Sequence, residues 1–158
     1  GRSRAELEEL ARSAGWRGMV AGQMLDIEAE SRRRQPLAAI RRIQQLKTGA
    51  LFRFACEAGA IMAEAPRLAL RRYADHMGLA FQIADDVLDV ASSPAKLGKA
   101  TQKDKSSGKA TFVDHLGVEG ARRAAALEAG RAIAALKPYG AKADLLREAA
   151  RFAVERER

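Results

Sequence analysis

The stretch that decides the fold is Leu79-Ala80-Phe81-Gln82-Ile83-Ala84-Asp85-Asp86-Val87-Leu88-Asp89-Val90. Its apolar residues, and those before it back to Leu68, recur at helical spacing but lie on more than one face of the helix. A helix with so broad an apolar surface belongs in the middle of a bundle, where neighbouring helices shield it from water. The stretch therefore predicts a central helix of an all-α fold, and its three aspartates need a separate explanation.

The composition of the whole chain agrees with an all-α fold. Ala, Leu, Arg and Glu dominate the 158 residues, whereas only 5% are aromatic and four are proline, which is typical of long helices. The length and a hydrophobic content of 47% predict a single all-helical unit over residues 1–158. Cys56 is the only cysteine, which excludes an intrachain disulfide and favours a cytoplasmic location. No stretch is apolar and long enough to suggest membrane insertion.

Apolar periodicity, glycines and prolines predict where the helices begin and end. The predicted helices cover residues 6–13, 16–29, 36–63, 66–92, 113–136 and 141–154. Gly18 and Gly22 lie four residues apart in the second of these, a spacing that favours close approach of a neighbouring helix. Lys47-Thr48-Gly49 places two poor helix formers inside the third, which indicates a kink, a packing notch or a ligand site.

The aspartates of the central helix require a cation. Residues 73–95 contain no Lys or Arg, although the chain carries 28 of them. On a helix, Asp89 lies one turn after Asp85 and Asp86, so the three carboxylates project over one sector. Burying a carboxylate without a partner costs several kcal/mol. Mg²⁺, which prefers carboxylate, water and phosphate oxygens, is the natural partner; an Arg or Lys from another helix is the ordinary alternative.

A lysine-rich loop at residues 95–111 follows the acids. Its basic residues are all lysines, in a chain where Arg outnumbers Lys: Lys96, Lys99, Lys103, Lys105 and Lys109. Lysine is a compact point charge suited to phosphate oxygens, and Gly98 and Gly108 would let the backbone approach a ligand. Such loops are more often solvated surface segments. The position directly after a carboxylate cluster nevertheless predicts a metal–diphosphate site.

Four motifs together resemble one family. They are Gln23-Met24-Leu25-Asp26, Lys47-Thr48-Gly49, Phe81-Gln82-Ile83-Ala84-Asp85-Asp86-Val87-Leu88-Asp89, and Leu97-Gly98-Lys99 followed by Gly108-Lys109-Ala110-Thr111. In this order and spacing they resemble the polyprenyl (trans-isoprenyl) diphosphate synthases, in particular the bacterial farnesyl diphosphate synthases (geranyltranstransferases). The resemblance covers nearly all of this chain and roughly the C-terminal half of the family's chain. It therefore implies the C-terminal helices of an isoprenoid synthase helical bundle.

The resemblance also implies roles for individual residues. Metal ligation would fall to Asp85 directly, supported by Asp86, Asp89 and, through water, Asp104. The allylic diphosphate, dimethylallyl or geranyl diphosphate, would be held by Lys47, Thr48, Gln82, Lys99 and Lys109. Phe81 would line the apolar side and Asp26 would lie opposite.

In the chemistry that the resemblance implies, Mg²⁺ and the lysines, with Lys47, Lys99 and Asp85 as catalytic residues, stabilise the diphosphate as it leaves the allylic carbon. The double bond of isopentenyl diphosphate then attacks the allylic cation in a head-to-tail (1'-4) condensation, and farnesyl diphosphate is the expected product. The family further implies a homodimer for the full-length protein, and no nucleic-acid partner is expected.

One departure from the family pattern limits these expectations. The family's first aspartate-rich motif, and the basic residues that receive isopentenyl diphosphate, have no counterpart here, since Asp85-Asp86 is the only paired Asp-Asp. The chain alone is therefore expected to be inactive unless a companion fragment supplies the missing helices. Three alternatives are left open: an enzyme that makes longer prenyl chains, a degenerate or proteolysed remnant, and a non-catalytic helical module. The last would use the net charge of +8 to bind nucleic acid or acidic partners.

Overall fold

The structure, a computed structural model, describes residues 2–31, 35–92 and 110–156. These residues form α1 (Arg2–Ala14), α2 (Met19–Glu30), α3 (Leu37–Lys47), α4 (Gly49–Met62), α5 (Leu68–Ser92), α6 (Phe112–Ala135), the 3-10 helix η2 (Lys137–Ala143) and α7 (Asp144–Glu155). No strand occurs among the described residues. The predicted all-α class is confirmed.

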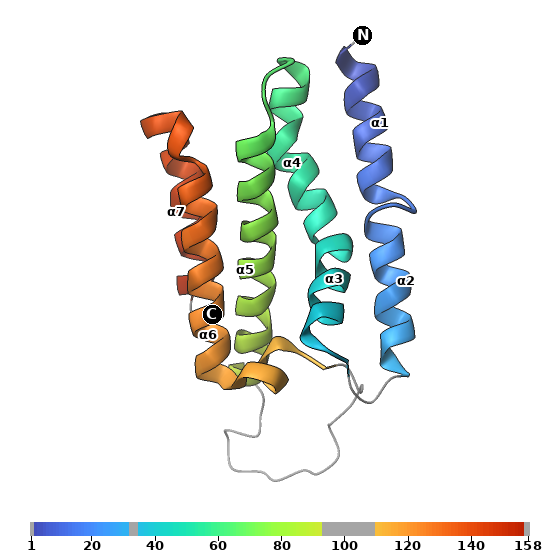
Figure 1. Cartoon of the computed structure of the whole chain (residues 1–158), viewed down its shortest axis with the longest axis vertical. Helices are drawn as coiled ribbons and strands as arrows, with labels where there is room; N and C mark the ends of the chain where they lie inside the picture. Colours follow the sequence, from blue (N-terminus) through green and yellow to red (C-terminus); the bar gives the residue numbers. More distant parts are fainter. Residues whose placement is uncertain (1, 32–34, 93–109, 157–158) are drawn as a thin grey trace.

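The helices lie side by side with their long axes roughly parallel (Figure 1). α1 and α2 form one column, α3 and α4 form the next, and α5 lies between that column and α6 with α7. α5 contacts α3, α4, α6 and α7, as its broad apolar surface predicts.

Two groups of buried residues explain why α5 is apolar on more than one face. Toward its C-terminal end, Leu79, Ile83 and Val87 pack with Ile40 of α3 and with Phe112 at the start of α6. Toward its N-terminal end, α5 packs against other residues of α6, η2 and α7. The core therefore continues along the whole of α5 and holds its C-terminal aspartates in place.

The prediction of a single helix over residues 36–63 was wrong. α3 ends and α4 begins at Thr48, whose φ of −111° and ψ of −48° bend the chain. The hydrogen bond from Thr48 N to Gln44 O (3.1 Å) closes α3, and the one from Phe52 N to Thr48 O (3.2 Å) opens α4. The apolar periodicity nevertheless runs through Thr48, and only the interruption Lys47-Thr48-Gly49 marks the kink.

Gly22 explains how α2 reaches this kink. A Cβ atom added to Gly22 would lie 2.2 Å from Lys47 N, a distance that no side chain tolerates. The close helix approach predicted from the Gly18 and Gly22 spacing is therefore confirmed at Gly22. Gly18 instead faces the last turn of α1, where an added Cβ would meet Ser13 O at 2.0 Å.

The C-terminal helices contain two features that periodicity did not predict. α6 bends at Gly117, whose φ of 68° is readily available only to glycine. Its first turn consequently lies across the lower end of the bundle in Figure 1 before the helix ascends. The predicted break at Pro138-Tyr139-Gly140 is η2 rather than an irregular turn.

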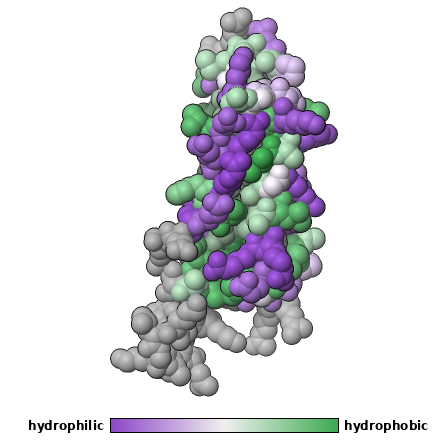
Figure 2. Space-filling view, turned by 90° about the vertical axis from the view of Figure 1, so that its left-hand side faces the viewer, coloured by the Kyte–Doolittle hydropathy of each residue, from purple (hydrophilic) through white to green (hydrophobic). Residues whose placement is uncertain are grey.

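Polar and apolar residues alternate over the side of the molecule on which α7 lies (Figure 2). Leu145 and Phe152 of α7 are 80% and 68% exposed. None of the described helices is both long and apolar enough to cross a membrane.

Candidate functional site

Three of the four predicted metal ligands, Asp85, Asp86 and Asp89, occupy the last turns of α5, and each has a different environment. Asp86 is half-buried, and both of its oxygens accept hydrogen bonds. Oδ2 accepts from the backbone N–H of Phe112 at 3.0 Å, and Oδ1 accepts from Gln82 Nε2 at 3.5 Å. These bonds tie the end of α5 to the start of α6.

Burial raises the pKa of Asp86 above its usual value. The hydrogen bonds from Phe112 N–H and Gln82 oppose this rise in pKa, whereas the neighbouring charges of Asp89 and Asp85 add to it. Burial is the largest of these causes, so the charged form of Asp86 is disfavoured mainly because its carboxylate is withdrawn from water. A cation near the three carboxylates would lower that pKa again and stabilise the charged form.

Asp85 already has a cationic partner. Its Oδ1 accepts a hydrogen bond from Nη2 of Arg156, the residue that follows α7. The Arg156 guanidinium also lies over the ring of Phe81, with its central carbon 4.3 Å from the ring centre. Phe81 in turn packs at a tilt against Phe52 of α4, 5.6 Å between ring centres. At Asp85 the ordinary alternative, an arginine from another part of the chain, is therefore present.

Sequence reasoning missed Arg156. It lies 71 residues from Asp85 in the chain, within the alternating run Glu155-Arg156-Glu157-Arg158. Alternating charges of this kind are typical of a solvated helix surface. No local signal distinguishes Arg156 from the arginines of α7.

The predicted diphosphate ligand Lys47 pairs with Asp26. Lys47 Nζ lies 2.6 Å from Asp26 Oδ2, and the side chains are 36% and 9% exposed respectively. Asp26 therefore orients the amine while part of the lysine stays open to solvent. Thr48 lies beside it, half-buried at the kink between α3 and α4.

Three predicted ligands, Lys99, Asp104 and Lys109, lie outside the described residues, so their roles stay predictions. The residues directly after Lys109 are described. The N–H of Phe112 binds Asp86, and Thr111 caps α6 by accepting from Asp114 N at 3.2 Å. The first residue of α6, which follows the lysine-rich segment, is therefore bound directly to an aspartate of α5.

The aspartates fit Mg²⁺ as an open site rather than as a closed cage. Among the described residues, no three or more His, Cys, Asp or Glu side chains converge as a preformed metal site. Mg²⁺, however, commonly takes one or two carboxylates and completes its shell with water and phosphate oxygens. Asp85 is 40% exposed at its side chain, and Asp89 one turn later is exposed. Asp85 also attracts a cation, the guanidinium of Arg156.

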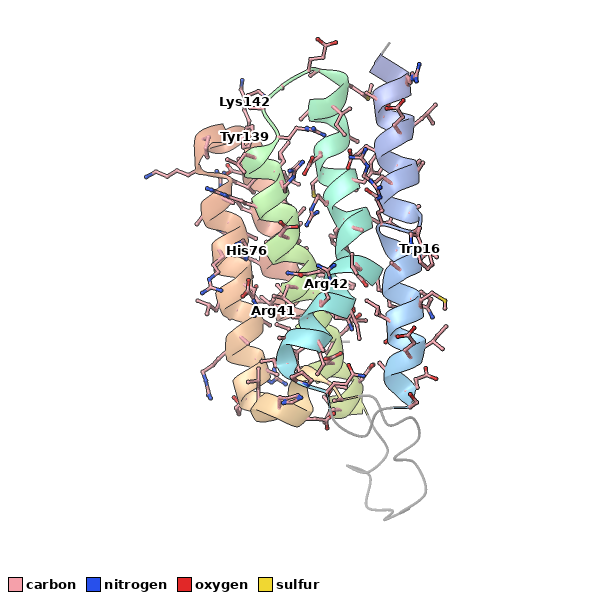
Figure 3. The ribbon with its side chains drawn as sticks, turned by 45° about the vertical axis from the view of Figure 1, so that its right-hand side comes forward. Trp16, Arg41, Arg42, His76, Tyr139 and Lys142 are labelled. Carbon is pink, nitrogen blue, oxygen red and sulfur yellow. The ribbon has the colours of Figure 1, made fainter. Side chains whose placement is uncertain are left out.

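Two further buried acids are structural. Glu128 of α6 lies 2.6 Å from His76 Nδ1, 2.8 Å from Arg131 Nη1 and 3.7 Å from Arg41 Nη2. Figure 3 labels Arg41 of α3 and His76 of α5, which reach Glu128 from two different helices. Glu57 of α4 similarly holds Arg71 of α5 through two hydrogen bonds, of 2.7 and 3.1 Å. Both acids hold helices together away from the aspartate cluster.

Comparison with known proteins relates this arrangement to one family. The family profile described as polyprenyl synthetase matches residues 5–141. Farnesyl diphosphate synthase of Escherichia coli (strain K12) is 46% identical over 123 residues, which are 75% of this chain and 41% of that protein. Geranylgeranyl diphosphate synthase of Cyanophora paradoxa is 40% identical over 116 residues, 72% of this chain and 39% of that protein. The chain spans less than half the length of either relative.

Solved structures show the same helical arrangement. An apo FPP/GFPP synthase from Zymomonas mobilis superposes with a TM-score of 0.81 and 43% identity, covering 94% of this chain and 49% of that one. A polyprenyl synthase from Caulobacter crescentus CB15, complexed with calcium and isoprenyl diphosphate, gives a TM-score of 0.80 and 30% identity over 97% of this chain and 59% of that one. The fold is thus part of the isoprenoid synthase helical bundle, as predicted.

Proposed function

The chain belongs to the polyprenyl synthetase family, and we propose from this premise that it supplies one half of a prenyltransferase site. This half-site binds Mg²⁺ together with an allylic diphosphate at the C-terminal end of α5. The observation that carries the proposal is the aspartate cluster itself. Its innermost member, Asp86, has a raised pKa that a bound cation would lower, and its outer members Asp85 and Asp89 reach solvent.

Each described residue has a definite task in this proposal. Asp85 and Asp89 ligate the metal, and Asp86, held by Phe112 N–H, adds negative charge close by. Lys47, oriented by Asp26, donates to a diphosphate oxygen, and Gln82 and Thr48 contribute polar contacts. Phe81 and Phe52 line the apolar side, where a prenyl chain would lie. Mg²⁺, when bound, neutralises the diphosphate so that it can leave the allylic carbon.

The substrates proposed are dimethylallyl or geranyl diphosphate and isopentenyl diphosphate, joined head to tail to give farnesyl diphosphate. The E. coli relative and the C. paradoxa relative are named for products of different length, so a longer-chain product is the alternative within the same class. Lys99, Lys109 and Asp104 would complete the diphosphate and metal contacts. Cytoplasmic location and homodimer formation by a full-length protein remain part of the proposal.

Calorimetric titration of geranyl diphosphate into the chain, with Mg²⁺ or with EDTA, tests the half-site. We expect binding only with Mg²⁺, and Asp85→Ala to weaken it at least about tenfold, as loss of a metal ligand or its support does. The control is Asp75→Ala, which removes another aspartate of α5 that also pairs with an arginine, Arg53 of α4, at 2.6 Å. It should bind like the wild type.

Two results would contradict the proposal. One is diphosphate binding that is equally strong in EDTA, and the other is binding that Asp85→Ala leaves unchanged. Oligonucleotide binding that weakens with salt and is indifferent to Asp85→Ala would instead support a non-catalytic basic module.

A further inference from the structure

Arg156 places a positive charge at the carboxylate to which the proposed function assigns a metal ion. Its Nη2 donates to Asp85 Oδ1, and its guanidinium lies against the ring of Phe81. The side chain is 22% exposed, so most of it is withdrawn from water. Arg156 is therefore packed into the candidate site by its contacts with Asp85 and Phe81, and it is not a solvated surface residue.

The contacts of Arg156 are incomplete. Its Nε is buried and has no hydrogen-bond partner among the described residues. Buried donors are nearly always satisfied in folded proteins, so an unsatisfied one marks a group whose partner is missing or changes. The cation–π contact with Phe81 holds the charge near the site without using any of its N–H donors.

Two cations cannot share Asp85 without cost. A divalent ion at this carboxylate would lie within a few ångströms of the guanidinium, where like charges repel strongly at the low effective dielectric of a half-buried site. A diphosphate changes this balance, because its negative charge attracts the metal and the guanidinium together. The repulsion between the two cations is therefore largest when no diphosphate is present.

We propose that Arg156 competes with the metal ion for Asp85 and so makes metal binding depend on diphosphate. Without the anion, the guanidinium occupies Asp85 and the metal binds weakly. With the anion, the metal takes the carboxylate and the guanidinium moves from it. This inference rests on the proposed function, since it concerns the same half-site.

Equilibrium dialysis of the chain against Mn²⁺, with the Mn²⁺ retained by the protein measured against a protein-free cell of the same Mn²⁺ and pyrophosphate content, tests the competition. Without diphosphate, Arg156→Gln should bind Mn²⁺ about fivefold more tightly than the wild type, the change expected for loss of one partly exposed ion pair. With saturating inorganic pyrophosphate, the advantage should disappear. Arg156→Lys, which keeps the charge, should stay close to the wild type in both conditions.

The matched control is Arg151→Gln, which removes the same charge from an exposed position of α7. If Arg151→Gln tightens Mn²⁺ binding as much as Arg156→Gln, the effect is one of net charge and the competition is wrong. Unchanged or weaker Mn²⁺ binding by Arg156→Gln also overturns it. If the wild type does not bind Mn²⁺ even with pyrophosphate, the proposed half-site itself fails, and the inference fails with it. Circular dichroism of each variant checks that the helices are intact.

Discussion

Asp86 is held in a position that disfavours its own charge. Burial and the charges of Asp85 and Asp89 raise its pKa, and the hydrogen bonds from Phe112 N–H and Gln82 only partly offset the rise. Because the folded-state pKa lies above the unfolded value of about 3.9, the folded protein binds a proton more tightly than the unfolded chain. The charged form therefore reduces stability above the folded-state pKa, and this penalty vanishes below the unfolded-state pKa.

Asp86→Asn should therefore stabilise the metal-free protein at neutral pH. Asparagine keeps a carbonyl oxygen to accept from Phe112 N–H but carries no charge. We expect Tm in EDTA to rise by about 2 °C at pH 7 and not to change near pH 3, where both states of the wild type are protonated. Thermal unfolding followed by circular dichroism measures this difference.

The exposed Asp89 provides the comparison, since Asp89→Asn should shift Tm less than Asp86→Asn does. A lower Tm for Asp86→Asn at pH 7 would show that the charge of Asp86 stabilises the fold, contrary to the argument. Asp86→Asn should also weaken metal-dependent diphosphate binding, because a charge that destabilises the fold is here retained for function.

The sequence showed that the aspartates need a cation, but not which residue supplies one. The need follows from residue types and helical spacing, which are local. The partner Arg156 is brought to Asp85 by the packing of α7 on α5, which local spacing does not report. For the same reason the pairing of Lys47 with Asp26, across 21 residues, was not predicted, although the resemblance implied a role for each residue.

The junction of α2 with the kink between α3 and α4 positions Lys47. Gly22 permits this close contact because it has no side chain. An added Cβ would meet backbone atoms of Leu46 and Lys47, which cannot rotate away. Gly22→Ala should reduce the free energy of unfolding by about 2 kcal/mol, within the usual range for overpacking. Urea unfolding measures the loss.

Gly59→Ala is the matched control for Gly22→Ala. Gly59 lies inside α4, and an added Cβ would meet nothing within 4 Å. Alanine is the better helix former, so this variant should gain about 0.5–1 kcal/mol. If both alanine variants changed the free energy of unfolding in the same direction, the close approach of α2 to Lys47 would not be what destabilises Gly22→Ala.

Glu57 joins α4 to α5 near the end of the bundle opposite the aspartates. Its side chain is 1% exposed and accepts two hydrogen bonds from Arg71. Glu57→Gln should reduce the free energy of unfolding by about 2 kcal/mol, because hydrogen bonds to charged groups are lost at a buried position. Chemical denaturation measures it.

Glu8→Gln supplies the reference for Glu57→Gln. Glu8 pairs with Arg4 at 2.8 Å on the surface of α1, and its loss should alter the free energy of unfolding by less than about 0.5 kcal/mol. Equal effects of the two substitutions would mean that burial adds nothing to the Glu57 pair.

Helix prediction succeeded where apolar periodicity and breakers agree, and failed where long-range contacts bend a helix. The central helix, predicted over residues 66–92, is α5 (Leu68–Ser92), because its ends carry Pro66 and Pro94. The bend at Thr48 falls at a single residue that still bonds to Gln44 and Phe52 through its backbone, so the apolar periodicity continues through it. The bend at Gly117 requires a positive φ. A glycine within a helical pattern does not by itself show that its φ is positive.

The chain presents much apolar surface on α1, α2 and the turn between them. The exposed large side chains there are Leu7, Leu10, Trp16, Val20, Met24, Leu25 and Ile27. Trp16, labelled in Figure 3, is 75% exposed. So much exposed apolar area is characteristic of surfaces that other protein segments cover, and it accords with a chain that spans 41% of its E. coli relative.

The chain alone should bind substrate without turning it over. The condensation also requires a second aspartate-rich motif for further metal ions and a set of basic residues that receives isopentenyl diphosphate, and the chain has no second Asp-Asp motif. With radiolabelled isopentenyl diphosphate, geranyl diphosphate and Mg²⁺, we expect no labelled prenyl product above background. Metal-dependent product formation by this polypeptide alone would show that the half-site is a complete site. A full-length relative assayed in parallel verifies the substrates and buffer.

We propose above that metal and diphosphate bind at the C-terminal end of α5. Paramagnetic broadening of amide NMR signals tests the position of this site most directly. Substoichiometric Mn²⁺ with inorganic pyrophosphate should broaden the amide signals of Gln82 to Asp89, together with Phe112, whose N–H binds Asp86. Signals of Glu6, Glu8 and Glu9 in α1, which lies at the opposite end of the bundle (Figure 1), should stay sharp. Broadening centred on other surface acids such as Glu119 or Glu148, or broadening unaltered by Asp85→Ala, would contradict the account.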